Sequence, residues 1–166
     1  MTIIHTNRLK LRPAKIADAI ALHAAFSHSE AMKYWDTLPH SELSQTEDFV
    51  RGMMGMSPEQ GEDFVVEFGG QVIGKAGFWR FPEIGFIFNP DYWGKGFASE
   101  TVSALIDYGF NKKQLMNITA DVDPRNERSI RLLEGLGFVE THRESKTFKV
   151  GDQWVDSVYF RLDRPL

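Results

Sequence analysis

The fold and the function expected of this chain depend above all on residues 83–100, which carry the sequence EIGFIFNPDYWGKGFASE. Residues 83–88 are rich in bulky apolar side chains and are followed by Asn-Pro, a combination that predicts a strand and its end. From residue 98 to residue 110, apolar side chains recur at helical spacing. The sequence therefore predicts a strand, then a glycine loop at residues 93–98 (WGKGFA), then a helix.

The glycine loop and Ser99 bring small side chains to the predicted start of a helix. Several backbone amides can converge there at the positive end of the helix dipole, which is an arrangement that binds phosphate groups. Glycines with this spacing also occur in ordinary strand-to-helix turns, where they serve only to reach positive φ angles. Taken alone, the loop leaves both interpretations open.

Two other phosphate-binding motifs can be tested directly. Residues 69–75 (GGQVIGK) have the glycine and lysine spacing of a P-loop, but Ala76 stands where magnesium binding requires Ser or Thr. The same segment predicts the turn and second strand of a hairpin. A dinucleotide fingerprint needs a third glycine where this chain has Ser99. Neither motif is supported.

The remaining pattern predicts one α/β (α+β mixed) domain over residues 1–166. Strands are expected at 8–12, 64–68, 71–79, 117–122, from 138 onward, at 147–150 and at 155–162, and helices at 16–26, 44–56 and 126–136. Ser44 and Glu47 predict a capping box at the start of the second helix. This order implies a central, mostly antiparallel twisted sheet of about seven strands, with helices on both faces.

Composition narrows the classes of protein. Hydrophobic residues make up 42% and charged residues 25% of the chain, as in globular domains, and the net charge of −4 argues against a nucleic-acid partner. The absence of cysteine excludes disulfides and a cysteine nucleophile, and the histidine spacing predicts no metal site. With no long apolar run and no signal-peptide pattern, we expect a cytoplasmic protein without a membrane partner.

Residues 83–100 resemble the coenzyme A-binding segment of the GNAT superfamily of acetyltransferases. Residues 126–138 (NERSIRLLEGLGF) resemble the helix that follows it in that family. Residues 6–13 (TNRLKLRP) and 154–159 (WVDSVY) are similar to the Rim-type branch, which contains ribosomal-protein N-terminal acetyltransferases. The resemblance thus covers essentially the whole chain.

Two departures from the family pattern matter. Only Gly96 and Ala98 match the general pattern of the loop, although Trp93 is typical of the ribosomal branch. Many members have a Tyr, the presumed acid for the leaving thiolate, where this chain has Leu133.

The resemblance implies a GNAT-like fold and transfer of an acetyl group from acetyl-CoA to a primary amine, by direct attack while both substrates are bound. It implies no metal. A backbone amide in residues 86–88 is the implied donor to the carbonyl oxygen of the thioester. The implied cofactor-binding residues are Phe86, Ile87, Phe88, Trp93, Gly94, Lys95, Gly96, Phe97, Ala98, Ser99 and Asn126.

For each of the remaining candidate side chains, a purely structural role is the alternative to a catalytic or binding role. Glu83 is the first candidate for the general base, or else a solvated carboxylate at a strand edge. Ser129 is a candidate acid beside Asn126, which also caps a helix. Tyr34, Trp35 and Trp79 are predicted to line a substrate pocket, or else to pack in the core. Arg125, Arg128 and Arg131 could approach the adenosine 3′-phosphate, but we favour a solvated helix face.

The acceptor is expected to be the N-terminal α-amine of a protein or peptide. An α-amine with a pKa of about 7.7–8.0 is neutral in roughly 10–17% of molecules at pH 7, whereas a lysine amine is neutral in about 0.04%. An α-amine therefore reacts even with a weak base. The alternatives are a small amine, such as an antibiotic, polyamine or amino acid, and a non-catalytic acyl-CoA sensor. Either a monomer or a homodimer is compatible with the sequence.

Overall fold

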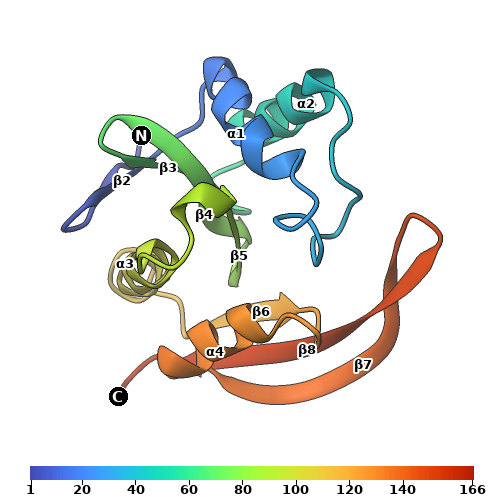
Figure 1. The fold of residues 1–166 in the computed structure, drawn as a ribbon. Coiled ribbons are helices and arrows are strands. Elements are labelled where there is room, and N and C mark those ends of the chain that lie inside the picture. The colour runs from blue at the N-terminus through green and yellow to red at the C-terminus, as the bar shows by residue number, and fades with distance from the viewer.

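The computed structural model describes all residues from 1 to 166 and contains one eight-stranded sheet with the order β1-β2-β3-β4-β5-β6-β8-β7 (Figure 1). The strands are β1 (Ile4–His5), β2 (Leu9–Arg12), β3 (Glu62–Phe68), β4 (Gln71–Arg80), β5 (Glu83–Phe88), β6 (Asn117–Val122), β7 (Val139–Val150) and β8 (Gln153–Asp163). The helices are α1 (Ala19–Phe26), α2 (Leu43–Met54), α3 (Phe97–Asn111) and α4 (Glu127–Gly135), with short 3-10 turns η1 (Ile16–Asp18) and η2 (Pro90–Tyr92). None of these helices combines the length and the apolar character that crossing a bilayer requires.

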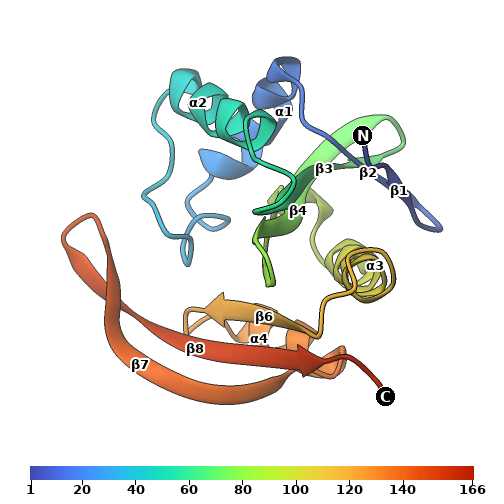
Figure 2. The same ribbon diagram turned by 180° about the vertical axis from the view of Figure 1, so that it is seen from behind.

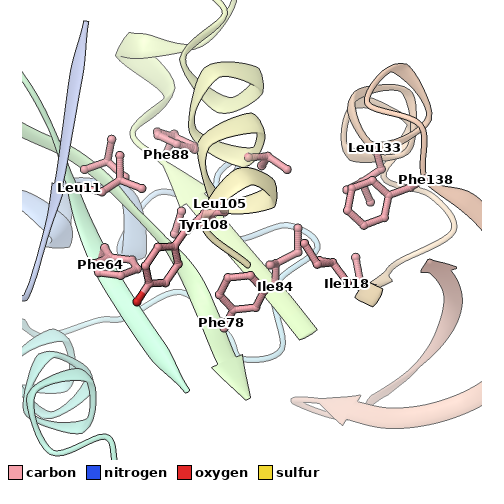
Figure 3. Close-up of a cluster of buried hydrophobic side chains, with 14 of the residues drawn as sticks. Leu11, Phe64, Phe78, Ile84, Phe88, Leu105, Tyr108, Ile118, Leu133 and Phe138 are labelled. Atoms are coloured by element: carbon pink, nitrogen blue, oxygen red, sulfur yellow. The ribbon is translucent and has the colours of Figure 1, made fainter. Parts of the chain in front are cut away.

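Helices cover both faces of the sheet because successive strand side chains point to opposite sides. In β3, Phe64 and Val66 join the large apolar cluster under α3 and α4, whereas Val65 joins the smaller cluster under α1 and α2. Leu105 and Tyr108 of α3 lie over the strands that carry Phe64 and Phe78 (Figure 3). The predicted fold class is confirmed.

The feature of the sheet that matters most for function lies between β5 and β6. All other neighbouring strands are antiparallel, but these two are parallel, and their pairing is confined to Glu83 and Thr119. The other edge of β5 pairs with β4 as far as Phe88. Beyond this single bridge, residues 85–88 present one edge whose backbone groups have no strand partner.

Several sequence-based expectations need correction. The two-residue strand β1 was not expected, because two residues are too few for any periodicity to be visible. Residues 139–150 form one long strand instead of two. Helix α2 begins at Leu43 with Glu42 as its N-cap, and the side chain of Gln45 accepts the amide of Glu42 at 3.0 Å, so the predicted box at Ser44 was wrong by two positions.

Other local predictions are confirmed. Gly69 and Gly70 have φ angles of 56° and 81° in the tight turn between β3 and β4, so the segment that resembled a P-loop is a hairpin. The side chain of Asn126 accepts the amide of Ser129 at 3.2 Å and caps α4, and Gly137 leaves that helix with a φ of 94°.

Candidate active site

A cavity of about 810 Å³ opens beside the free edge of β5. This volume is in the range of small-molecule sites. Three segments line it: part of the loop after α1, the end of β5 with the loop that follows, and the first turns of α4. The lining residues are Glu30, Ala31, Lys33, Tyr34, Trp35, Phe86, Ile87, Phe88, Tyr92, Trp93, Gly94, Gly96, Phe97, Ala98, Ser99, Arg125, Asn126, Glu127, Arg128, Ser129 and Leu132.

The glycine loop offers a row of free amides to this cavity. Gly94 and Gly96 have φ angles of 75° and 79°, which turn the chain sharply into the start of α3. The amides of residues 94–99 donate to no acceptor in the protein. They lie at the N-terminus of a fifteen-residue helix, where the helix dipole favours a negative charge. The loop can therefore bind a diphosphate through backbone groups alone.

Trp93 joins the two sides of the cavity. Its indole nitrogen donates to the carbonyl oxygen of Phe88 at 3.0 Å, which ties the glycine loop to the end of β5. The guanidinium of Arg128 lies over the Trp93 ring, 4.3 Å from its centroid. An indole face attracts a cation in this position. Trp93 thus spans from β5 to the first turn of α4.

Arg125, which precedes α4, and the α4 residues Arg128 and Arg131 do not form one ridge. Arg125 is held by the buried carboxylate of Asp123 at 2.7 Å, and Arg131 pairs with Glu127 at 2.9 Å. Arg128 pairs with no carboxylate and lines the cavity. Its side chain is exposed, as expected of a solvated helix face, and its positive charge stays available for an anionic group.

Thirteen of the sixteen predicted site residues lie on the cavity and three do not. Those on the cavity are Tyr34, Trp35, Phe86, Ile87, Phe88, Trp93, Gly94, Gly96, Phe97, Ala98, Ser99, Asn126 and Ser129. Lys95 is not among the lining residues, and its ammonium lies 5.6 Å from the ring centroid of Tyr92. Trp79, near the end of β4, and Glu83, at the start of β5, lie outside the lining, and the indole nitrogen donates to the carboxylate at 3.1 Å.

The loop after α1 forms the aromatic wall of the cavity through Tyr34 and Trp35. Beneath this wall, the ammonium of Lys75 lies 2.7 Å from Asp63 and 5.7 Å from the ring centroid of Trp35. The Lys75 side chain is only 2% exposed. Burial raises the pKa of Asp63, and the neighbouring ammonium opposes that rise. A buried charged pair therefore supports one wall of the cavity.

A second set of side chains lies on the sheet face that carries α1 and α2, where β5 and β6 begin to separate. We call Glu83, Asp121 and Glu144 the acidic group. Partial burial raises the pKa of Asp121, and the negative charges of Glu83 and Glu144 add to this rise. Tyr159 donates to Glu144 at 3.0 Å. A positive group bound here would relieve the repulsion between the carboxylates.

The residues of the cavity fit coenzyme A. Its diphosphate needs donors, which the amides of residues 94–99 supply, and its amide-containing arm needs backbone partners, which the free edge of β5 supplies. Arg128 adds a positive charge close to both. The described side chains bring together no set of three metal-binding groups.

The structure explains the missing acid at Leu133, and it adds cavity residues that the sequence did not indicate. Leu133, on the inner face of α4, is fully buried, so the position where many GNAT members carry an acid is occupied here by core packing. Tyr92, Lys33 and Leu132 line the cavity without having been predicted. The recurrence of arginine every three residues was the one signal that pointed toward Arg128.

The comparisons with known proteins agree with this geometry. The family model described as "Acetyltransferase (GNAT) domain" matches residues 8–139. The chain is 39% identical to the "Uncharacterized N-acetyltransferase p20" of Bacillus licheniformis over 147 residues, which cover 83% of each chain. It is 28% identical to the "Spermidine N(1)-acetyltransferase" of Escherichia coli strain K12, covering 90% of this chain and 83% of that one.

Among solved structures, RimL, the ribosomal L7/L12 alpha-N-protein acetyltransferase in complex with coenzyme A, has the same fold, with a TM-score of 0.86 and 17% identity over 98% of both chains. The family match extends over most of the chain and includes both β5 and the glycine loop. The chain therefore belongs to the GNAT family of N-acetyltransferases.

Proposed function

We propose that this protein transfers an acetyl group from acetyl-CoA to the N-terminal α-amine of a protein or peptide. The observation that carries the donor half of this proposal is the row of free amides at residues 94–99, beside the unpaired edge of β5. The amides bind the diphosphate, and the strand edge binds the pantetheine arm. The donor supplies an acyl group activated as a thioester.

Backbone groups of β5 also serve the reaction. Residues 86–88 line the cavity on the edge that has no strand partner. An amide there donates to the thioester carbonyl oxygen as the attacking amine makes it negative, an interaction that is strongest in the transition state. The carbon–sulfur bond then breaks, the acetyl group stays on the amine nitrogen, and the sulfur leaves as a thiolate that takes up a proton.

The proton transfers need a weak base and an acid. Ser129 lines the cavity, and its hydroxyl is the candidate acid for the thiolate, since the buried Leu133 supplies none. Glu83 is the first candidate for the base, acting through water because it lies outside the lining. A weak base is sufficient for an α-amine, which is neutral in roughly 10–17% of molecules at pH 7.

A polyamine is the second candidate acceptor, and the acidic group favours it. Three carboxylates on one face, at Glu83, Asp121 and Glu144, would attract a substrate with several positive charges. The Escherichia coli relative named for spermidine acetylation is 28% identical, whereas the structural similarity to RimL extends to the fold alone. The two candidates differ in whether the acceptor carries charges beyond the reacting amine.

Thiol release from acetyl-CoA separates these acceptors. We expect turnover with lysine-free peptides that have a free N-terminus, and none with the same peptides after N-terminal acetylation. Turnover confined to spermidine and related amines would replace the first candidate with the second. Binding of acetyl-CoA without turnover on any amine would contradict the enzymatic proposal and favour a sensor.

A further inference from the structure

Arg8, in the turn between β1 and β2, holds the glycine loop from outside the cavity. Its guanidinium donates to the carbonyl oxygen of Lys95 at 2.9 Å and to the carboxylate of Glu100 at 2.7 Å. The same guanidinium lies over the ring of Phe97, 4.5 Å from its centroid. One side chain therefore contacts the loop, the first residue of α3 and the end of that helix's first turn.

Glu100 fixes Arg8 in this place. Its carboxylate accepts the backbone amide of Arg8 at 2.8 Å and the hydroxyl of Thr6 at 2.6 Å, in addition to the guanidinium. Burial opposes ionisation of Glu100, but these hydrogen bonds outweigh it and lower the pKa of the carboxyl. The turn at residues 6–8 and the start of α3 are thereby joined by four hydrogen bonds that include the one to Lys95.

The hydrogen bond to the Lys95 carbonyl also orients the N–H of Gly96, which belongs to the same peptide group. The peptide between Lys95 and Gly96 is trans, so its carbonyl and its N–H point in opposite directions. Arg8 is not among the cavity-lining residues, whereas Gly96 is. Because the carbonyl is held on the Arg8 side, the N–H of Gly96 is directed to the cavity side.

We infer that Arg8 is a positioning residue for donor binding: it holds the Lys95–Gly96 peptide in the orientation that presents the Gly96 amide to the diphosphate. This inference rests on the proposed function, since it assigns the loop to coenzyme A. Gly94 and Gly96 both adopt positive φ, and the amides of residues 94–99 make no hydrogen bond in the protein that would hold them. Without Arg8 the peptide is free to rotate and turn its carbonyl oxygen toward the phosphates.

The effect of Arg8 is thus one of preorganisation. A loop that is already ordered loses less entropy when its ligand binds. Replacing Arg8 with Gln removes the guanidinium fork while leaving the backbone amide of residue 8 in place. We expect affinity for coenzyme A to fall about tenfold, measured by calorimetry. Arg51→Gln is the matched control, because Arg51 pairs with Asp48 at 2.8 Å on α2 and has no contact with the loop.

Donor fragments distinguish positioning from a general structural role. Arg8→Gln should weaken binding of coenzyme A and of 3′-dephospho-coenzyme A by the same factor, because both carry the diphosphate. It should leave the kcat/KM of S-acetylpantetheine, which has no phosphate, within about twofold of wild type. An equal loss with all three ligands would overturn the inference.

Measuring the affinity at high salt distinguishes positioning of the loop by Arg8 from long-range electrostatic attraction between Arg8 and the phosphates. A direct charge effect between exposed groups weakens strongly at about 0.5 M salt, because the screening length shortens. The fold-loss caused by Arg8→Gln should persist at that salt concentration, and its disappearance would overturn the inference.

Wild-type protein that binds no coenzyme A would contradict the proposed function as well, whereas equal binding by wild type and Arg8→Gln contradicts the inference alone. If Arg8→Gln does not fold, Glu100→Gln replaces it, with a loss of the same sign expected.

Discussion

The two sides of the active site are built from different parts of the chain. The donor side consists of backbone groups in one continuous segment, from the edge of β5 through the glycine loop to α3. The acceptor side consists of side chains from separate segments: the loop after α1, the start of β5, and strands β6, β7 and β8, of which the last two form the long curved hairpin at the edge of the sheet in Figure 2. In the proposed function, the main chain binds the donor that the family shares, and side chains select the acceptor.

The largest expected effect is on stability, and it comes from the buried ion pair of Lys75 and Asp63 beneath the acceptor side. Lys75→Met leaves Asp63 as an unpaired charge in a nearly closed site, where one of its oxygens already has no partner. We expect the free energy of unfolding to fall by about 3–5 kcal/mol, measured by urea denaturation. Lys113→Met is the matched control, since Lys113 pairs with Glu62 at 2.8 Å but is 27% exposed, and should cost about 1 kcal/mol or less. Equal losses would show that burial of the Lys75 pair is unimportant.

The next effect breaks the donor side without disturbing the fold. Gly96→Val places a branched side chain at a φ of 79°, with its Cβ 3.4 Å from the Arg8 guanidinium. The loop must change shape, so we expect affinity for coenzyme A to fall about a hundredfold, with an unchanged circular dichroism spectrum. Gly52→Val on α2, where a Cβ meets no atom within 4 Å, is the control. Undiminished affinity in Gly96→Val would refute the assignment of the loop.

A smaller effect tests the acidic group. Glu83→Gln removes one of the charges that raise the pKa of Asp121, along with the candidate base. We expect kcat to fall about tenfold and the affinity for acetyl-CoA to stay within about twofold, because Glu83 lies away from the donor. Glu59→Gln, at an exposed position outside the cavity, serves as the control. A wild-type rate and pH profile would assign the base to water or to another residue.

The smallest effect concerns the pH dependence of stability through Glu100. The pKa of this carboxyl is lowered in the folded protein, so its ionised form stabilises the fold above the unfolded value of about 4.3. That contribution is lost as the pH falls through the folded pKa. Glu100→Gln should therefore be less stable than wild type by no more than about 1 kcal/mol at pH 7, and the difference should shrink below about pH 4 in urea unfolding. A difference that grows on acidification would contradict the assigned ion pair.

The difference between the two sides also explains what the sequence could predict. Positive φ at Gly94 and Gly96, the strand before them and the cap at Asn126 are local requirements, and local requirements leave a pattern in the sequence. The approach of Arg8 to Lys95 joins residues 87 positions apart, and no periodicity indicates such a contact. The two-residue strand β1 was missed because it is too short for alternation to be visible.

The acceptor side was predictable only in part for the same reason. Tyr34 and Trp35 were identified by residue type, and the structure places them on the cavity. Trp79 has the same character, but its indole is hydrogen-bonded to Glu83 beyond the lining, a position decided by how β4 and β5 pair. Asp121 and Glu144 are brought together only by the pairing of β6 with β8 and of β8 with β7, which the sequence pattern does not indicate.

The central claim is that backbone amides bind the donor while side chains meet the acceptor. Two-dimensional amide NMR spectra of isotope-labelled protein, recorded during titration with coenzyme A, test it most directly. We predict that the largest shifts fall on the amides of residues 94–99, with smaller shifts at residues 86–88. Saturable binding that leaves the amides of residues 94–99 unmoved would contradict the account.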